Sequence, residues 1–234
     1  MKINDKLDLR NCNCMELMQQ YPDKYFDLAI CDPPYGIVGR ASLAGGGKTK
    51  NRPKFMDDGK MEKWDIAPTP DYFIELFRVS KNQIICGANN FVLPPTRGFI
   101  VWDKGTTAPS FSQYDYFWTS FNILPKLANI RLLKGFLSPE KTIHCTQKPV
   151  KLYEWLLSNY AKAGDKILDT HLGSASIAIA CDNLGFELVG SELDAEYYEK
   201  SIKRIKSHLK QGVLFEKTLP NMPNPTQPTL NFGL

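Results

Sequence analysis

The stretch that decides the fold is KILDTHLGSASIAIACDNLGFELVG, residues 166–190. Residues 166–169, Lys-Ile-Leu-Asp, predict a short strand, and the small and apolar residues of 174–184 predict a helix. Gly185 suits the position after that helix, because glycine readily adopts the left-handed conformation found there. Residues 186–190 predict a second strand. A strand–helix–strand unit of this size is typical of a parallel sheet covered by helices.

The turn inside this unit can approach a ligand closely. Gly173 permits a tight turn, and the small side chains of Ser174 and Ser176 leave the backbone amides of a helix N-terminus accessible to an anionic or carboxylate group. Glu192 stands 23 residues beyond Asp169, where an acidic side chain can accept hydrogen bonds from ribose hydroxyls. The turn alone is better explained as an ordinary strand–helix connection. Together with Glu192 it favours a nucleoside-containing cofactor, although no dinucleotide-binding G-x-G-x-x-G is present.

Other segments extend the same alternation of strands and helices. Apolar or aromatic strands are expected at 26–31, 83–86, 98–102, 114–121 and near 130–133, and helices at 71–80, with Asp71 as N-cap, 150–161 and 194–210. No internal repeat or second core is evident. We therefore expect one α/β domain over residues 1–218, with a doubly wound, mostly parallel sheet. Residues 219–234 are expected to be a flexible tail, because they contain four prolines and no charge.

A second motif, Asp32-Pro33-Pro34-Tyr35, follows the strand at 26–31. Open α/β sheets bind ligands at the carboxyl ends of their strands, where Asp32 would lie. The two prolines fix the backbone, so that the Asp32 carboxylate and the Pro33 carbonyl can both accept hydrogen bonds from an exocyclic amine. Tyr35 offers a ring that can stack on a planar base. A Pro-Pro turn that simply ends a strand is the plainer alternative, and we favour the functional interpretation.

Composition excludes several other classes of protein. With 43% hydrophobic and 23% charged residues, the chain is not wholly disordered. No apolar run reaches the roughly 18 residues of a membrane span, and the first residues do not resemble a secretory signal, so we expect a cytoplasmic protein without a membrane partner. The six cysteines form no C-x-x-C pair, so neither a disulfide framework nor a metal site is expected.

Together the motifs resemble those of S-adenosylmethionine-dependent DNA amino-methyltransferases. Residues 32–35 resemble motif IV, in the form most typical of adenine-N6 enzymes, and residues 169–176 resemble motif I. Residues 144–149 resemble the H-x-T-Q-K-P signature, residues 192–204 the E-L-D…Y…R segment, and residues 11–17 the N-G-D-C-L-E segment. Because motif IV precedes motif I, the resemblance implies the circularly permuted β class. Its fold is a Rossmann-like sheet with a small inserted DNA-recognition region.

The resemblance also implies the roles of individual residues. The catalytic residues would be Asp32, Pro33, Pro34 and Tyr35. Binding of S-adenosylmethionine would involve Asn13, Asp32, Lys148, Asp169, Leu172, Gly173, Ser174, Ser176 and Glu192. Some positions depart from the family pattern: Thr170, His171 and Ala175 within motif I, Cys145, and Asn13 where an aspartate is usual. None of these departures lies in the motif at 32–35, so we expect an active enzyme. The departures should affect its affinity for the cofactor more than its catalytic step.

The implied reaction is transfer of a methyl group to the N6 amine of adenine in DNA. The base would be flipped out of the duplex and methylated directly, without a covalent enzyme intermediate. Cytosine-N4 methylation is the nearest alternative, since the same pocket can serve another exocyclic amine, but Asp rather than Ser at position 32 favours adenine. A catalytically silent DNA-binding relative is a third possibility. Such enzymes belong to restriction–modification systems or occur as orphan or phage methylases.

The expected contacts with DNA lie in two insertions, residues 36–66 and about 105–143. Residues 36–55 hold five basic residues and no acidic one, and they directly follow the catalytic motif, so they can reach phosphates near a flipped base. The DNA-binding residues named from this stretch are Arg40, Lys48, Lys50 and Arg52. A solvated surface loop is the plainer alternative.

Two further partners are suggested by resemblance. The end of the chain, Gln227-Pro-Thr-Leu-Asn-Phe232, resembles the Q-x-x-L-x-F peptide by which bacterial replication proteins bind the sliding clamp. Many members of the family pair as homodimers. The sequence itself leaves the oligomeric state open.

Overall fold

The computed structural model describes residues 2–37, 65–105, 112–131, 143–144 and 146–212. Most of the predicted DNA-contacting insertions, including Arg40, Lys48, Lys50 and Arg52, lie outside the described residues. The same is true of the predicted tail at 219–234 with its clamp-like peptide. Of the described residues, no helix is both long and apolar enough to cross a membrane.

Eight strands form one sheet in the order β1-β8-β7-β2-β3-β5-β4-β6. The strands are β1 (Leu7–Asn11), β2 (Phe26–Cys31), β3 (Ser80–Cys86), β4 (Phe99–Asp103), β5 (Tyr114–Thr119), β6 (Lys126–Asn129), β7 (Lys166–Asp169) and β8 (Glu187–Glu192). Every neighbouring pair is parallel except the two that involve β5, which runs antiparallel to β3 and to β4. The sheet is therefore mixed and mostly parallel, as the sequence predicts.

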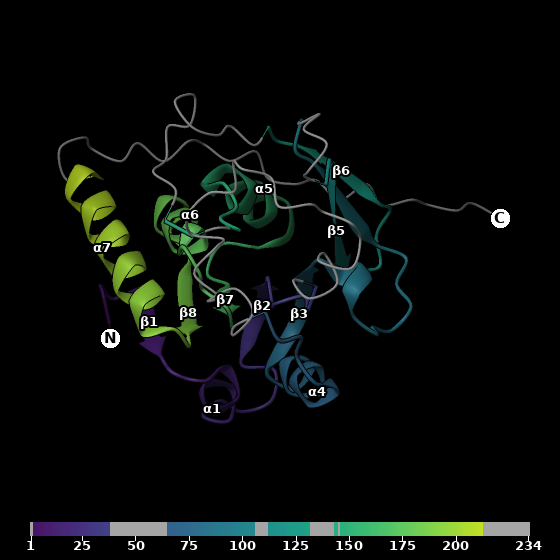
Figure 1. The fold of residues 1–234 in the computed structure, drawn as a ribbon, viewed down its shortest axis with the longest axis horizontal. Coiled ribbons are helices and arrows are strands. Elements are labelled where there is room, and N and C mark those ends of the chain that lie inside the picture. Colours follow the sequence, from purple (N-terminus) through teal and green to yellow (C-terminus); the bar gives the residue numbers. More distant parts are fainter. Residues whose placement is uncertain (1, 38–64, 106–111, 132–142, 145, 213–234) are drawn as a thin grey trace, which may run out of the picture.

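Helices cover both faces of the sheet (Figure 1). They are α1 (Cys14–Met18), α4 (Pro70–Val79), α5 (Val150–Tyr160), α6 (Ser176–Leu184), α7 (Ala195–Gly212) and the single-turn η2 (Ala88–Asn90). Strand β2 shows the two-sided packing directly: Leu28 and Ile30 join the core under α5, α6 and α7, whereas Ala29 and Cys31 join the core under α1 and α4. Alternate side chains of a strand point to opposite faces, so an almost continuous apolar run is what a doubly covered sheet requires.

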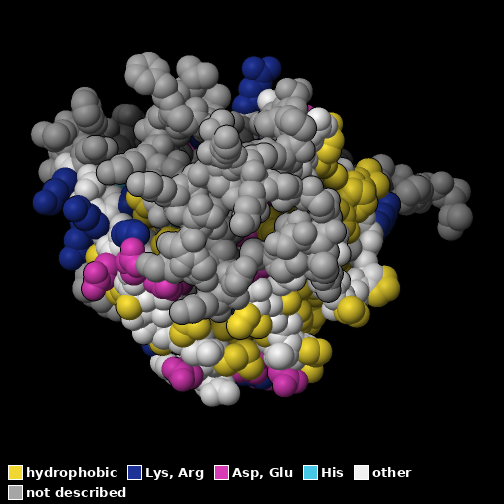
Figure 2. All heavy atoms as spheres, viewed as in Figure 1, with side chains coloured by type: hydrophobic (Ala, Val, Ile, Leu, Met, Phe, Trp, Pro, Cys, Tyr) yellow, Lys and Arg dark blue, Asp and Glu magenta, His cyan; other side chains and the backbone are white. Residues whose placement is uncertain are grey.

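Helix α7 shows the opposite, one-sided pattern. Ile202 and Ile205 are buried, whereas Lys203, Lys206 and Lys210 are exposed. Apolar residues at helical spacing give one buried stripe, and the remaining turn positions carry charge. Lys and Arg side chains accordingly gather on the α7 side of the face seen in Figure 2.

Several element boundaries differ from the sequence predictions. Strand β6 ends at Asn129, before the strand predicted near 130–133, of which residues 132 and 133 lie outside the described residues. The Ile130 carbonyl accepts a hydrogen bond from the Trp102 side chain (Nε1, 2.7 Å). Helix α4 is preceded by Thr69 as N-cap, not by Asp71, because proline is well suited to the first helical position that Pro70 takes.

Two further differences from the sequence predictions concern strand β1 and the first residue of α6. Strand β1 was not predicted from the sequence; it pairs with β8 at the edge of the sheet. Helix α6 begins at Ser176 rather than at 174, because Ala175 has left-handed backbone angles (φ 59°). Gly185 ends this helix with φ 80°, as predicted.

The pairing of strands assembles one functional edge. The carboxyl ends of β1, β8, β7, β2 and β3 lie together because these strands are parallel. The antiparallel β5 begins at this edge, and β4 ends there, where Asp103 pairs with Tyr114. The motif after β2 and the turn after β7 therefore share this edge. The circular permutation implied by their order along the chain stays a prediction.

The packing of α4 can be tested with two substitutions on the same helix. Leu76 is fully buried, whereas Ile74 is 65% exposed. We expect Leu76→Ala to lower the free energy of unfolding in urea by about 3 kcal/mol, because it leaves a cavity in the core. Ile74→Ala serves as the matched control and should change it by less than about 0.5 kcal/mol. Equal effects of the two substitutions would contradict the observed docking face.

Candidate active site

Asp32 lies at the centre of the functional edge, immediately after β2. Its Oδ1 accepts a hydrogen bond from the Tyr35 hydroxyl (2.6 Å). Its Oδ2 accepts one from the ammonium group of Lys148, two residues before α5. The side chain of Lys148 is 6% exposed and that of Asp32 18%. Both oxygens of the carboxylate are thus held by side chains from different parts of the chain.

The charges of this pair stabilise each other. Burial alone would raise the pKa of Asp32, but the attraction of Lys148 and the hydrogen bonds from Lys148 and Tyr35 outweigh it and hold the pKa below its usual value. Burial alone would lower the pKa of Lys148, but the Asp32 carboxylate raises it well above its usual value. Both groups are therefore ionised at neutral pH, and Asp32 is an acceptor of hydrogen bonds rather than a base of ordinary strength.

The ring of Tyr35 is held against the end of β3. Gly87 has φ +63°, and a Cβ added there would lie 2.2 Å from Tyr35 Cε1, so only glycine fits beside this ring. Phe91 meets the same ring edge-on at a centroid distance of 6.1 Å. The hydroxyl also lies 3.3 Å from Cys86 Sγ. Burial, reinforced by the Asp32 charge, raises the pKa of Tyr35 well above its usual value, so its proton remains available for Asp32.

The turn after β7 is tied to the end of β8 by Glu192. The Gly173 amide donates to Glu192 Oε2 (2.8 Å), and the Asp194 amide donates to Oε1 (3.0 Å). Gly173 has φ +52°, the conformation for which glycine suits this turn. Burial raises the pKa of Glu192 above its usual value, although the amide hydrogen bonds oppose this.

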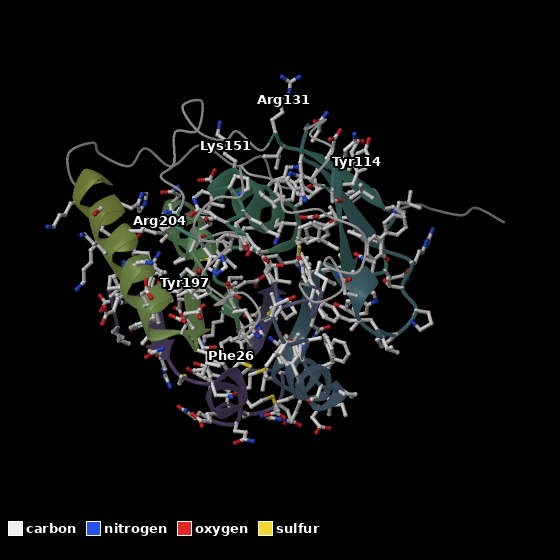
Figure 3. All side chains as sticks on the ribbon, in the orientation of Figure 1. Phe26, Tyr114, Arg131, Lys151, Tyr197 and Arg204 are labelled. Carbon is white, nitrogen blue, oxygen red and sulfur yellow. The ribbon has the colours of Figure 1, made fainter. Side chains whose placement is uncertain are left out.

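The two serines of the turn are held from α7. Arg204 donates to the Ser174 carbonyl (2.7 Å) and to Ser176 Oγ (3.0 Å), and it lies between α7 and α6 (Figure 3). Both serines are buried. Leu172 is also buried, and its amide donates to the Ser191 carbonyl (2.8 Å). These contacts fix the course of the turn. Arg204 is the arginine of the E-L-D…Y…R segment noted in the sequence, where it was given no role in the site.

Asp169 is a buried carboxyl group at the end of β7. Its Oδ1 accepts a hydrogen bond from the His171 amide (3.0 Å). Burial raises its pKa to about 8, and the negative charges of Asp32 and Glu192 act in the same direction. Three acidic side chains thus influence one another at this edge, an arrangement that favours a positively charged ligand.

Asn13 lies near the same edge, after β1. Its Oδ1 accepts a hydrogen bond from the Met15 amide (2.8 Å) and so caps α1. The neighbouring Asn11 donates through Nδ2 to the carbonyls of Glu192 (2.7 Å) and Leu193 (3.1 Å). The start of α1 is therefore tied to the end of β8, which brings Asn13 to the Glu192 side of the site.

The structure thus groups the predicted residues in two sets. Tyr35 and Lys148 surround Asp32, and the predicted cofactor residues surround the turn after β7. Lys148, predicted with the cofactor residues, is in contact with the catalytic motif. Two residues beside the motif were not predicted. Asp65 accepts hydrogen bonds from the amides of Tyr35 and Gly36, and no local pattern marks it; Gly87 follows an apolar strand and has no other signal in the sequence. No cluster of three metal-ligating side chains occurs within the described ranges.

A profile of the DNA methylase family matches residues 94–204. This segment contains Lys148 and the whole turn from Asp169 to Ser176. Over this segment the chain is similar to DNA methylases. Type II methyltransferase M.HpaI of Haemophilus parainfluenzae is 30% identical over 81 residues, which are 35% of this chain and 26% of that protein. Type II methyltransferase M2.MboI of Moraxella bovis is 23% identical over 86% of this chain and 90% of its own.

Solved methyltransferase structures share the fold. The M1.HpyAVI–SAM complex aligns with a TM-score of 0.51 at 21% identity, covering 85% of this chain and 99% of that one. The PvuII DNA methyltransferase, described as cytosine-N4-specific, aligns with a TM-score of 0.56 at 13% identity, covering 89% and 93%. At these identities the likeness establishes the methyltransferase type of Rossmann-like sheet.

The ion pair at the centre of the site can be tested by a double-mutant cycle. We expect Lys148→Met to lower the free energy of unfolding by about 3 kcal/mol, because it leaves the Asp32 carboxylate buried without its partner. The double variant Asp32→Asn/Lys148→Met should be more stable than the sum of the single effects predicts. Urea unfolding at pH 7 gives the free energy of unfolding of the wild type, of the single variants Asp32→Asn and Lys148→Met, and of the double variant. Strictly additive effects would show that the two side chains do not interact.

Proposed function

We propose that this protein transfers a methyl group from S-adenosylmethionine to the N6 amine of adenine in DNA. The observation that carries the proposal is the ionised Asp32 carboxylate, held by Lys148 and Tyr35 on the same sheet edge as the turn at 172–176. A site of this kind can hold an amine nucleophile beside a nucleoside cofactor. The relationship to the DNA methylase family supports the proposal.

The acidic edge fits the proposed cofactor. S-adenosylmethionine supplies a methyl group activated by a sulfonium cation. The carboxyl groups of Asp169 and Glu192 offer negative charge at this edge. Burial raises the pKa of Asp169, and the positive charge of Lys148 only partly opposes this, so a bound cation would further favour the ionised carboxylate. The residues proposed to hold the cofactor are Asn13, Asp169, Leu172, Gly173, Ser174, Ser176 and Glu192. The M1.HpyAVI–SAM complex has the same fold.

Lys148 and Asp32 are proposed to act together on the target amine. The amine of a base is a weak nucleophile, because its lone pair is delocalised into the ring. Hydrogen bonds from the amine to Asp32 and to the Pro33 carbonyl would make the lone pair available and stabilise the positive charge that develops on nitrogen. Lys148 keeps Asp32 ionised and fixed in position, so its proposed role is exerted through Asp32 rather than on the cofactor.

Cytosine-N4 methylation is the second candidate, since PvuII methyltransferase shares the fold. The aspartate at position 32 favours adenine through its resemblance to the adenine-N6 form of the motif. The intact group of Asp32, Tyr35 and Lys148 argues against a catalytically silent relative. We also propose that the insertions at 36–66 and 105–143 contact DNA. On the same edge of the sheet, an ion pair (2.7 Å) joins Lys104, which follows β4, to Asp115 near the start of β5.

The proposal is tested by incubating the protein with labelled S-adenosylmethionine and unmethylated genomic DNA, followed by nucleoside mass spectrometry. We expect N6-methyladenine from the wild-type protein and from the control Asp71→Ala, whose side chain is exposed on α4. Asp32→Ala should lose at least about 100-fold in rate, because the stabilising carboxylate is gone, yet still bind the cofactor. N4-methylcytosine would select the second candidate. Near-normal transfer by Asp32→Ala would contradict the mechanism.

Cofactor binding should depend on pH through Asp169. Its pKa of about 8 means that the group is mostly protonated at pH 6 to 7, and a bound cation would favour the ionised form. Affinity for S-adenosylmethionine should therefore rise with pH, by up to about tenfold from pH 6 to pH 7, with release of a proton. Isothermal titration in two buffers of different ionisation enthalpy measures both quantities. Asp169→Asn should bind S-adenosylmethionine more weakly, and its affinity should not change with pH. If the affinity of Asp169→Asn rose with pH as steeply as that of the wild type, Asp169 would not be the titrating group.

A further inference from the structure

Asp65 makes an unusual set of contacts with the backbone that follows the catalytic motif. Its Oδ1 accepts hydrogen bonds from the amides of Tyr35 (3.0 Å) and Gly36 (2.9 Å), and its Oδ2 accepts one from the amide of Ile37 (2.7 Å). Three consecutive amides thus converge on one carboxylate, the arrangement known as an anion nest. Hydrogen bonds to a charged acceptor are about twice as strong as those between neutral groups.

The local backbone is shaped for this contact. Gly36 has φ +66°, and a Cβ added there would lie 3.1 Å from Ala67 Cβ and 3.3 Å from the Ala67 nitrogen. The glycine therefore allows both the left-handed turn and the close approach of the segment that carries Asp65. Asp65 lies 28 to 30 residues from its partners in the chain, so these hydrogen bonds join two distant segments beside the site.

The contacts form a continuous path to the catalytic carboxylate. Asp65 holds the amide of Tyr35, the hydroxyl of Tyr35 donates to Asp32 (2.6 Å), and the ring between them is confined by Gly87. Pro33 and Pro34 cannot donate amide hydrogen bonds, so the first amide after Asp32 that can anchor this loop is that of Tyr35. The Asp65 carboxylate accepts a hydrogen bond from that amide.

We propose that Asp65 is a positioning residue for methyl transfer, which acts by anchoring the backbone of Tyr35 and thereby aligning the Asp32 carboxylate with the target amine. This inference rests on the function proposed above. The hydrogen bonds described above join Asp65 to the backbone of residues 35–37, beside the catalytic motif rather than beside the cofactor turn. Its loss should therefore affect the rate of the chemical step more than cofactor binding. A displacement of about 1 Å at a reacting group can lower a rate by roughly 100-fold.

The test compares the full-length wild type with Asp65→Ala, Asp65→Asn and the control Asp71→Ala, which removes the same charge from the exposed face of α4. For Asp65→Ala we expect kcat to fall by roughly 10- to 100-fold, with the Kd for S-adenosylhomocysteine and the Tm close to those of the wild type. Asp65→Asn should recover part of kcat, because its amide oxygen still accepts hydrogen bonds. The control should match the wild type.

Amide hydrogen exchange, followed by NMR, reports on the anchor without depending on activity. We expect the amides of Tyr35, Gly36 and Ile37 to exchange at least about tenfold faster in Asp65→Ala than in the wild type, because each loses its acceptor. Unchanged exchange, or an unchanged kcat, would overturn the proposal. A loss of kcat matched by a loss of cofactor affinity and of Tm, with no recovery in Asp65→Asn, would also overturn it. If the wild-type protein transfers no methyl group, the function proposed above fails, and the exchange rates alone decide whether Asp65 anchors this backbone.

Discussion

The ion pair between Lys148 and Asp32 is the interaction on which the rest of the site depends. Asp32 is a mostly buried carboxylate at the end of a central parallel strand, and burial alone would raise its pKa. The ammonium group beside it and the hydroxyl of Tyr35 keep it charged. A charged, fixed acceptor is what a weakly nucleophilic amine needs from its surroundings during methyl transfer.

Contacts on both sides of this ion pair hold the neighbouring parts of the site in position. On the β3 side, Gly87 and Phe91 confine the ring of Tyr35. On the β7 and β8 side, Glu192 holds the glycine turn, and Arg204 holds its serines. Both supports come from residues at the carboxyl edge of the sheet or on the helices that follow it. The parallel arrangement of the strands is therefore a structural requirement of the site.

Much of this fold could be predicted from local patterns in the sequence. Short runs rich in apolar residues identified six of the eight strands found in the described residues, and β6 precedes the strand that was predicted near 130–133. The Asp-Pro-Pro-Tyr motif and the glycine turn, both noted in the sequence, lie on the same edge of the sheet. Strand β1 was not predicted, because polar residues alternate with its two leucines and its pairing with β8 joins segments far apart in the sequence. The left-handed angles of Ala175 shortened α6 in a way that the composition of the segment does not reveal.

What could not be predicted is the set of contacts that span long stretches of chain. Lys148 and Asp32 are 116 residues apart, and resemblance to the family placed Lys148 among the cofactor residues instead. Asp65 contacts the backbone after Asp32 across about 30 residues, and its own surroundings in the sequence contain no motif. Such contacts follow from tertiary packing, so only the folded chain reveals which charged groups meet.

The central claim is that the glycine turn and the Asp32–Lys148 pair form one site in which a methyl donor faces an acceptor amine. A crystal structure of the protein with bound S-adenosylhomocysteine tests this most directly. The account predicts the nucleoside between Glu192 and Asn13, the ligand sulfur directed toward Asp32, and the Lys148 contact retained. A ligand bound elsewhere, or a sulfur directed away from Asp32, would contradict it.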